Sequence, residues 1–526
     1  MSDAPTSLRE EAPSEEGAFF DRSHAPTRDE VTLAAVCSRC HVIGRRATPT
    51  YWGEVLCEAC GEEAVADGWP ARWWDAPPAP YLLALGAEGI YSLDGDGEPG
   101  PAYRWPANLE DLGSMCEFLS VSQVWIHESA LPRLGLPADA EIGASFPFFE
   151  LGEWKTSGRG GARGYVKIWR QGGAGLTVHF PSYEDGSPWL GTEDAFALLC
   201  HVAHYEAATK RSAPWYGGGS ITSDRWLRAK YRSPRRADII ETEHPPPLLD
   251  GPGRESRYFW TRYPAASERT FRYCHALDLN LAYAAVASSL PLPVGACDHQ
   301  DLPDFDKRVP GLWLIEPQEA SLDPLALRGK TGLLPAPWED QHRLGRPGPY
   351  WVTSPTMERV AQAGGFAIES YTWREHHHYL RPWYELIRDA RTELLPPMGV
   401  GGPALEAVKG ISRRGVGRLA NRDRAASTED LFQPYWESAV KAECRARLHR
   451  RLCALDVAPV AIDTDAVYFL SSRSSPEALA VRLGLPLGSG LGEFKAAGSC
   501  SGGEAREILA TRHGGTAIYQ LRKAVK

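Results

Sequence analysis

Two short apolar segments that end in aspartate, far apart in the chain, constrain the fold more than any other feature of the sequence. The first reads Ala-Leu-Asp278-Leu, and the second reads Val460-Ala-Ile-Asp463-Thr-Asp465. Each is typical of a buried strand that delivers a carboxylate at its end. Adjacent strands of this kind would set the carboxylates side by side, where they repel unless a cation lies between them. Mg²⁺ suits such a site, because it binds one or two carboxylates together with substrate phosphates.

The sequence around these segments alternates strand-like and helical runs, which is the pattern of an α/β protein. Strand-like runs cover 81–93, 121–128, 164–169 and 175–180, and helical runs cover 109–119, 193–210, 380–395, 403–421 and 434–455. A chain of 526 residues is long enough for several domains. We therefore predict an α/β multidomain fold.

Charge and hydropathy exclude several classes of protein. The chain has 57 Lys and Arg against 67 Asp and Glu, a net charge of −10, which argues against a protein that coats nucleic acid over its whole surface. It has no apolar run of about 18 residues, so we expect no transmembrane helix and no membrane partner. Its N-terminus lacks the basic and apolar regions of a secretory signal. We predict a cytoplasmic protein.

The cysteines indicate a metal site near the N-terminus. The chain has 11 cysteines, an odd number that favours a reducing compartment over a disulfide framework. Four of them form two CxxC pairs, Cys37-Ser-Arg-Cys40 and Cys57-Glu-Ala-Cys60, and each pair can point two thiolates at one centre. We predict a zinc ribbon over 31–66 with one structural Zn²⁺, because four thiolates leave no open position for catalysis.

The two aspartate segments, with a basic helix between them, resemble motifs A, B and C of family B DNA polymerases. The helix reads Leu405-Glu-Ala-Val-Lys409-Gly-Ile-Ser-Arg-Arg-Gly-Val-Gly417. The order and spacing of the three segments are closest to those of the compact, protein-primed enzymes of phages and linear plasmids. Two further segments extend the resemblance over about 80–526: Leu-Gly-Glu493-Phe-Lys495, and Tyr350-Trp-Val-Thr-Ser followed by Met357-Glu-Arg-Val.

The resemblance implies a metal site at the aspartates. Asp278 and Asp465 would bind two Mg²⁺ ions, with Mn²⁺ as an alternative, and Asp463 would be an auxiliary acid. The Leu279 carbonyl would be a backbone ligand. The N–H groups of 280–282 would face the triphosphate of an incoming dNTP.

The resemblance also implies residues that bind the nucleotide. The Tyr283 ring would leave no room for a 2′-hydroxyl and would select deoxynucleotides. The Lys409 ammonium would contact a phosphate, which suits a point charge. Arg388 or Arg391 would supply a second phosphate contact.

The segment after Lys409 departs from the family pattern, which continues with three residues and then Asn-Ser-any-Tyr-Gly. Here the sequence is Arg413-Arg-Gly-Val416-Gly. Val416 takes the place of the tyrosine that packs on the incoming base pair, so we expect looser base-pair checking. Arg413, Arg414 and Arg418 are expected to contact the DNA backbone.

The resemblance divides the chain into domains. Region 81–250 takes the place of an RNase H-like 3′–5′ exonuclease domain, an activity that needs about four carboxylates. Its first strand carries only one late acid, Glu88, and His201 and His204 stand where a third-motif acid is expected, so we predict that this domain is inactive. The remaining predicted parts are a disordered acidic tail at 1–30, a linker at 67–80, and a right-hand polymerase domain at 257–526 with the palm at 257–379 and 422–480, the fingers at 380–421 and the thumb at 481–526.

We therefore predict a DNA-directed DNA polymerase without exonuclease that extends a primer, or a terminal protein, on a DNA template. Its role would be the replication of a phage, a linear plasmid or a chromosome end. Two alternatives remain open. One is a degenerate polymerase that acts as a DNA- or telomere-binding scaffold, and the other is a template-independent nucleotidyl transferase.

Overall fold

A computed structural model of the chain contains two compact units, 1–67 and 68–526. In the first unit the described residues are four short strands, β1 (Ala35–Val36), β2 (Ile43–Gly44), β3 (Ala47–Pro49) and β4 (Val55–Cys57), paired β1 with β2 and β3 with β4. The predicted zinc ligands Cys37, Cys40 and Cys60 lie outside the described residues, and of Cys57 only the backbone is described. The predicted tail at 1–30 and most of the linker also lie outside them. In the second unit the described residues are 79–93, 103–137, 146–156, 164–171, 175–184, 186–231, 242–316, 329, 333–339, 348–395, 401–421, 432–512 and 514–525.

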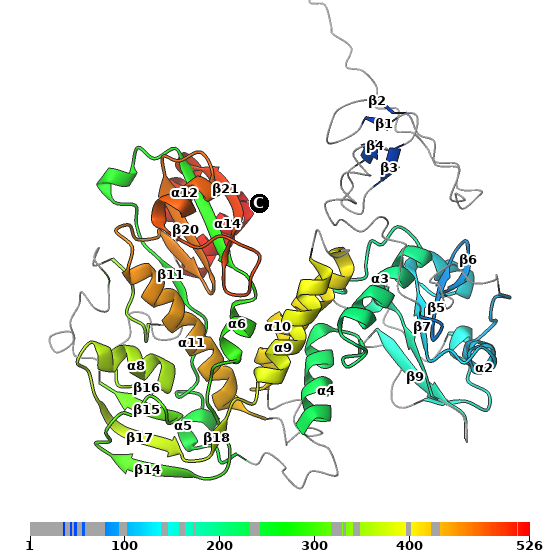
Figure 1. Cartoon of the computed structure of the whole chain (residues 1–526), viewed down its shortest axis with the longest axis horizontal. Helices are drawn as coiled ribbons and strands as arrows, with labels where there is room; N and C mark the ends of the chain where they lie inside the picture. The colour runs from blue at the N-terminus through cyan, green and yellow to red at the C-terminus, as the bar shows by residue number, and fades with distance from the viewer. Residues whose placement is uncertain are drawn as a thin grey trace, which may run out of the picture. The chain divides into compact units, whose positions relative to one another are not determined.

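The N-terminal part of the second unit forms a six-stranded mixed sheet with a helix on each face (Figure 1). Its strand order is β6-β5-β7-β10-β9-β8, and β5, β7 and β10 are parallel. Helix α2 packs on the face that holds Leu83, and α3 packs on the face that holds Leu82, because side chains alternate along a strand. The bounds are β5 (Leu82–Gly86), β6 (Gly89–Ser92), β7 (Gln123–Ile126), β8 (Lys155–Thr156), β9 (Tyr165–Trp169), β10 (Leu176–His179), α2 (Leu109–Phe118) and α3 (Ala195–Ala208), with short 3₁₀ turns at Glu128–Ala130, Pro132–Leu134, Pro147–Phe149 and Pro181–Tyr183. The predicted strand and helix runs of this region are confirmed.

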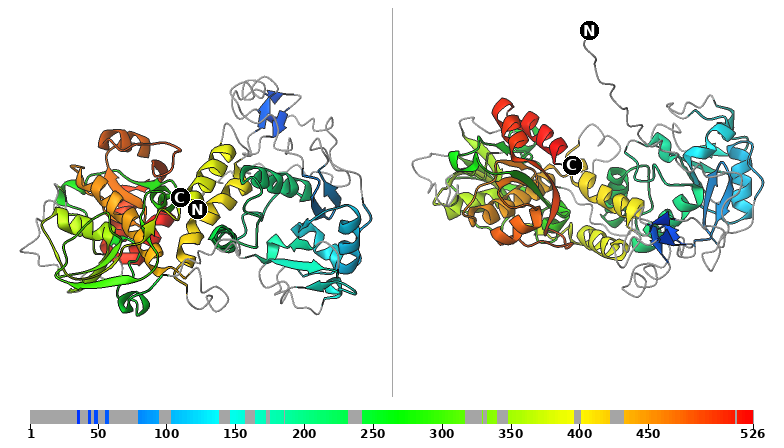
Figure 2. Two further views of the ribbon diagram at one scale, coloured as in Figure 1. Left: turned by 60° about the horizontal axis from the view of Figure 1, so that its bottom comes forward. Right: turned by 90° about the horizontal axis from the view of Figure 1, so that it is seen from above.

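A five-stranded antiparallel sheet carries the predicted aspartates. Its order is β11-β19-β20-β12-β21, with β11 (Phe259–Thr261), β12 (Tyr273–Leu279), β19 (Ala461–Asp463), β20 (Ala466–Ser471) and β21 (Phe494–Ser501). One face packs against α13 (Gly502–Thr511) and α14 (Gly514–Ala524), which are red in Figure 2. The other face packs against α6 (Ala282–Ala287), α11 (Pro434–Cys453) and α12 (Pro476–Leu483). The residues predicted as the thumb, 481–526, therefore contribute an edge strand and two helices to the sheet of the predicted palm.

A four-stranded sheet lies between β12 and α9 in the sequence, with the order β14-β17-β15-β16. Helix α8 covers one of its faces through Trp313, Val352 and Met357. The bounds are β14 (Cys297–Asp301), β15 (Gly311–Ile315), β16 (Tyr350–Thr353), α8 (Ser354–Gln362) and β17 (Ala367–Trp373), and a separate pair is β13 (Leu292–Pro293) with β18 (His376–His377). Two short helical segments, α5 (Pro246–Leu249) and a 3₁₀ turn at Ala266–Glu268, complete this part.

Helix α10 (Gly402–Arg418) joins the predicted exonuclease-like region to the predicted polymerase region. It packs against α9 (Arg381–Leu394) and α4 (Gly219–Tyr231), and all three lie together in both figures (Figures 1 and 2). The approach to α4 is close, because a Cβ on Gly219 would lie 2.2 Å from the Gly410 carbonyl carbon. One hydrophobic core therefore runs from Leu82 and Trp215 to Val408. Over the described part of the chain, no helix is both long enough and apolar enough to cross a membrane.

Candidate active site on the five-stranded sheet

Strand β12 and the β19–β20 hairpin bring the three predicted aspartates to one end of the sheet. Asp278 lies opposite Ala466 in the strand register, and the Leu279 N–H donates to the Asp465 carbonyl over 3.2 Å. Asp463 ends β19, and Asp465 follows it after a single residue with a φ of 62°. The predicted adjacency of these residues is confirmed.

The carboxylate of Asp465 carries an electrostatic penalty at this position. Burial, together with the negative charges of Asp278 and Asp463, raises its pKa to about 7, although Lys495 opposes the shift. Like charges that are held together in a partly desolvated place favour the protonated acid. The group therefore gains most from a cation, which would favour its ionised form.

Two cations approach the other two carboxylates. The Lys495 Nζ on β21 lies 2.8 Å from Asp278 Oδ2, and these residues are cross-strand partners. The Arg522 Nε on α14 donates to Asp463 Oδ2 over 3.0 Å, and Asp463 is buried. Sequence reasoning assigned no role to either cation. No local signal marks them, because the pairing of β12 with β21 and the docking of α14 bring them to the site.

The residues of the site fit a divalent cation only in part. Among the residues that the structure describes, no group of three or more His, Cys, Asp or Glu could hold a metal ion. The buried carboxylate of Asp463 is bound by Arg522, and Asp278 is paired with Lys495, so an ion held by Asp278 and Asp465 would compete with Lys495. Two carboxylates are a common protein contribution to a Mg²⁺ site that substrate phosphates complete. The arrangement thus suits an ion that arrives with a phosphate-bearing substrate better than a resident metal.

The backbone directly after Asp278 is held tightly. The Asn280 N–H donates to the Glu493 carbonyl over 2.9 Å, and its side-chain amide donates to the Gly488 carbonyl over 2.8 Å. Leu281 then adopts a left-handed φ of 44° and starts α6. The Asn280 N–H, which the sequence predicted to face a triphosphate, is therefore engaged within the chain.

Helix α6 carries Tyr283 close to the aspartates. Burial raises the pKa of Tyr283 well above its usual value, and the charges of Cys444 and Asp465 add to the shift. The phenol is therefore protonated at neutral pH. Tyr283 lies close to Asp465 on the helix that follows Asp278, and its predicted contact with the sugar stays a prediction.

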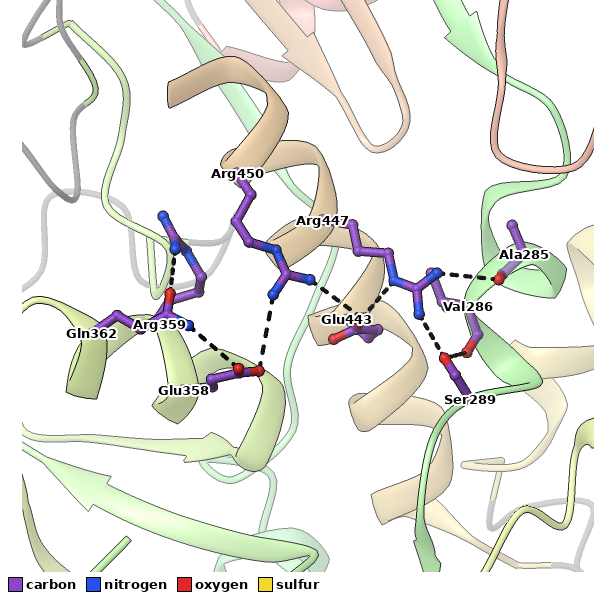
Figure 3. A network of polar contacts seen from close by, with 9 residues as sticks. All are labelled: Ala285, Val286, Ser289, Glu358, Arg359, Gln362, Glu443, Arg447 and Arg450. Carbon is purple, nitrogen blue, oxygen red and sulfur yellow. Dashed lines mark hydrogen bonds and ion pairs between the residues drawn. The ribbon is translucent and has the colours of Figure 1, made fainter. Parts of the chain in front are cut away.

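Helix α6 is anchored to α11 by a network that centres on Arg447 (Figure 3). Arg447 donates to the Ala285 carbonyl over 3.4 Å, to Ser289 Oγ over 2.6 Å and to Glu443 over 2.5 Å. Arg450 lies 3.6 Å from the same Glu443 carboxylate. The network fixes the helix that carries Tyr283 to the long helix behind the sheet.

The predicted phosphate-binding lysine lies on α10, which contacts α6. Lys409 forms an ion pair with Glu406 one turn earlier, and Arg413 lies 3.6 Å from the same carboxylate. The Arg413 side chain is 60% exposed. Lys409 and Arg413 thus form a basic edge of α10 that is partly neutralised by one acid.

The other three residues predicted to contact the nucleotide differ in their exposure to solvent. The prediction placed Val416 against a base pair. In the structure Val416 is buried, in the part of α10 that packs on α4 and α9. Arg391 is also buried, and its Nε and Nη1 have no hydrogen-bond partner among the described residues. Burial lowers the pKa of Arg391. Arg388 is exposed and pairs with Asp389 over 2.7 Å.

Two of the three predicted DNA-binding arginines face the exonuclease-like region. The Arg418 Nε lies 3.3 Å from Asp224 Oδ2 on α4, and its side chain is mostly buried. The Arg414 guanidinium lies against Gly186. Arg413 and Arg414 are both exposed, whereas Arg418 is mostly buried.

The first strand of the six-stranded sheet, β5, carries no acid. Strand β5 is filled by buried apolar residues, and Glu88 lies in the β5–β6 turn, where it accepts from the Ala195 N–H over 3.4 Å. His201 is buried in α3, and burial lowers its pKa to about 3, so it is neutral. The β5 residues and His201 are buried, whereas Glu88 is exposed in its turn.

The fold and the site together define an α/β protein with a pair of aspartates at one end of an antiparallel sheet. No protein-family model and no curated protein matches the chain. Among solved structures it is similar to Phi29 DNA polymerase complexed with primer-template DNA and incoming nucleotide substrates, with 11% identity, 78% of this chain and 81% of that chain covered, and a TM-score of 0.44. It is also similar to Phi29 DNA polymerase complexed with single-stranded DNA, with 10% identity, coverage of 80% and 83%, and a TM-score of 0.40. At such low values the likeness identifies no functional residue, so function must come from the residues of this chain.

Proposed function

We propose that the chain is a DNA-templated DNA polymerase of the family B type, which adds dNTPs to a primer hydroxyl by metal-dependent phosphoryl transfer. The observation that carries the proposal is the convergence of Asp278 with the Asp463-Thr-Asp465 turn on adjacent strands. These residues are far apart in the sequence, and they carry the resemblance to motifs A and C. A pair of carboxylates that destabilise each other has a direct use in binding cations with a triphosphate.

Each residue near the pair has a role in this proposal. Divalent ions, when bound, would neutralise charge on the triphosphate and orient the attacking hydroxyl. Asp278 and Asp465 would hold these ions, and Lys495 beside Asp278 would help to balance the charge. Tyr283 would present a protonated ring that excludes a 2′-hydroxyl. Lys409 would meet the triphosphate as a point charge.

The finer parts of the proposal rest on the sequence resemblance. They are the structural Zn²⁺, a second Mg²⁺ ion, a terminal protein as primer, and a role in replicating a phage, a linear plasmid or a chromosome end. The lack of an exonuclease is supported by the apolar β5 strand and by the neutral His201 in α3.

A second candidate function is favoured by the cations at the site. Lys495 and Arg522 already bind two of the three carboxylates, as expected of a protein that no longer uses a metal. In that case the chain would bind DNA as a scaffold without catalysis. The basic edge at Lys409 and Arg413 would serve either function.

Primer extension separates these functions. The assay uses a primed DNA template, Mg²⁺ and labelled dNTPs, with Asp278→Ala and Asp465→Ala as test variants and Asp304→Ala, an exposed acid, as the matched control. Loss of a few kcal/mol of charge stabilisation should lower the rate about 10²–10³-fold in both test variants and leave the control unchanged. Extension that ignores the template would indicate a nucleotidyl transferase. DNA binding without extension by the wild-type chain would overturn the polymerase proposal in favour of the scaffold.

A further inference from the structure

Two cysteines lie directly opposite each other on the sheet that carries the aspartates. Cys274 on β12 and Cys500 on β21 are cross-strand partners, and each thiol shifts the pKa of the other. Both pack in the hydrophobic cluster formed with α13 and α14, where Cys274 is fully buried and Cys500 is 9% exposed. The polymerase proposal gives neither cysteine a role.

The backbone around the pair sets a separation that a disulfide can span. The Gly502 N–H donates to the Arg272 carbonyl over 2.7 Å, two residues away in the same register. Cys274 and Cys500 therefore occupy a hydrogen-bonded position of the ladder, with a Cα separation of about 5.5 Å. That Cα separation is common for disulfide-linked residues, but the Cβ atoms of a hydrogen-bonded pair are farther apart than the roughly 3.5–4.5 Å of a disulfide, so the two strands must shift slightly for the sulfurs to bond.

The two thiols differ in reactivity. The hydrogen bond from Cys274 lowers the pKa of Cys500, whereas its bond to Cys500 and its burial raise the pKa of Cys274. The thiolate is the species that reacts with oxidants. Cys500, which is also the more accessible thiol, is therefore the site of first attack, and Cys274 is placed to react second.

We propose that Cys274 and Cys500 are an oxidative modification site, at which a hydroperoxide converts the two thiols into a cross-strand disulfide. The Cys500 thiolate attacks the peroxide, the O–O bond breaks, and Cys500 becomes a sulfenic acid while hydroxide leaves. The Cys274 sulfur then attacks the Cys500 sulfur and displaces its oxygen as water. Overall, two thiols and one hydrogen peroxide give one disulfide and two waters, and a dithiol reductant reverses the change.

The bond would join the strand of Asp278 to the strand of Lys495. It would close a loop that contains every element from α6 to α12, and closing a long loop restricts the unfolded chain most. The oxidised protein should therefore melt at a higher temperature than the reduced protein. This outcome does not depend on whether the chain polymerises DNA.

The test uses the purified full chain, treated with hydrogen peroxide, alkylated and mapped by mass spectrometry. We expect a linked Cys274–Cys500 peptide pair lighter by two hydrogen atoms, its loss on treatment with dithiothreitol, and a higher melting temperature before reduction. Cys274→Ser should leave Cys500 as a sulfenic acid that dimedone traps, and Cys500→Ser should leave Cys274 unmodified. Cys116→Ser is the matched control, because Cys116 is a buried free thiol in the core of the other sheet, and it should behave as the wild type.

Other outcomes would overturn the proposal. Recovery of Cys274 and Cys500 as separate alkylated peptides, under conditions that oxidise other thiols, would show that the pair does not link. Conversion of Cys500 to a sulfinic acid without a link would show that Cys274 cannot reach it. If a serine variant fails to fold, the wild-type peptide map alone decides.

Discussion

Replacing Asp465 by asparagine should make the protein more stable than the wild type. This gain in stability should be larger at pH 8 than at pH 5. The substitution removes the charge of a carboxylate whose pKa is about 7 in the folded protein and 3.8 ordinarily. A raised pKa means that the folded protein holds this proton more tightly than the unfolded chain does. The stability that the proton provides is therefore present at low pH and is lost as the pH rises from about 4 to about 7.

The size of the effect follows from the pKa difference. A shift of about three pKa units is equivalent to ~4 kcal/mol once the group is fully ionised. Between pH 5 and pH 8, the wild type should lose roughly 2–3 kcal/mol that Asp465→Asn keeps, as an upper estimate for a partly exposed group. Because asparagine has nearly the same shape, the difference between the two pH values isolates the charge from any change in packing.

Melting temperatures of the two proteins at pH 5 and pH 8 provide the assay. We expect the advantage of Asp465→Asn to grow by a few degrees between the two pH values. Asp304→Asn, which alters an exposed acid, should keep the same small difference at both. Mg²⁺ should raise the melting temperature of the wild type more at pH 8 than at pH 5, since ligands bind metals in their ionised form. An advantage of Asp465→Asn that is equal at both pH values would refute a raised pKa at Asp465.

Two further changes test the packing that supports the site. Arg445→Met should destabilise the chain by about 3–5 kcal/mol in urea unfolding, because it leaves the buried Glu255 carboxylate without its ion-pair partner. Arg308→Gln, at an exposed pair, should cost less than about 1 kcal/mol, and equal losses would contradict this reasoning. Gly219→Ala should cost about 1–3 kcal/mol because its Cβ would meet the α10 backbone. Gly417→Ala, which meets open space on α10, should be neutral or stabilising by up to about 1 kcal/mol, and a neutral Gly219→Ala would show that α4 and α10 separate freely.

The close packing of α4 on α10 connects the two halves of the second unit. Lys409 and Gly410 are neighbours on α10, and Gly410 lies against Gly219 of α4. A change in the exonuclease-like region that moved α4 would therefore also move the helix that carries Lys409. This contact gives the region a structural role even without catalytic acids of its own.

Local sequence patterns predicted the elements that carry the aspartates. Apolar runs bounded by polar residues predicted β12 and the β19–β20 hairpin, and helical periodicity predicted α9, α10 and α11. These signals are local, because a strand or a surface helix must show its buried face in its own residue pattern. The adjacency of Asp278 and Asp465 was predicted from the two apolar segments that end in aspartate, and the strand register bears it out.

Local patterns did not predict helix α4 or which face of α10 is buried. The sequence predicted no helix after 210 in this region, yet Gly219 begins a helix that packs on α10. Val416 looked like a residue that faces a base pair, and it is buried. The reason is that a glycine or a valine is compatible with several environments. Which face of α10 is buried depends on the helices that pack against it.

The charge balance of the site was also decided by the tertiary structure. Lys495 and Arg522 come to Asp278 and Asp463 from β21 and from α14, and the same strand brings Cys500 to Cys274. The sequence contains all of these residues, but their spacing along the chain does not indicate which of them are in contact. The sequence states the chemical type of each side chain. The pKa shifts, ion pairs and thiol pairs depend on distances of a few ångströms, and only the packing of the sheet sets these distances.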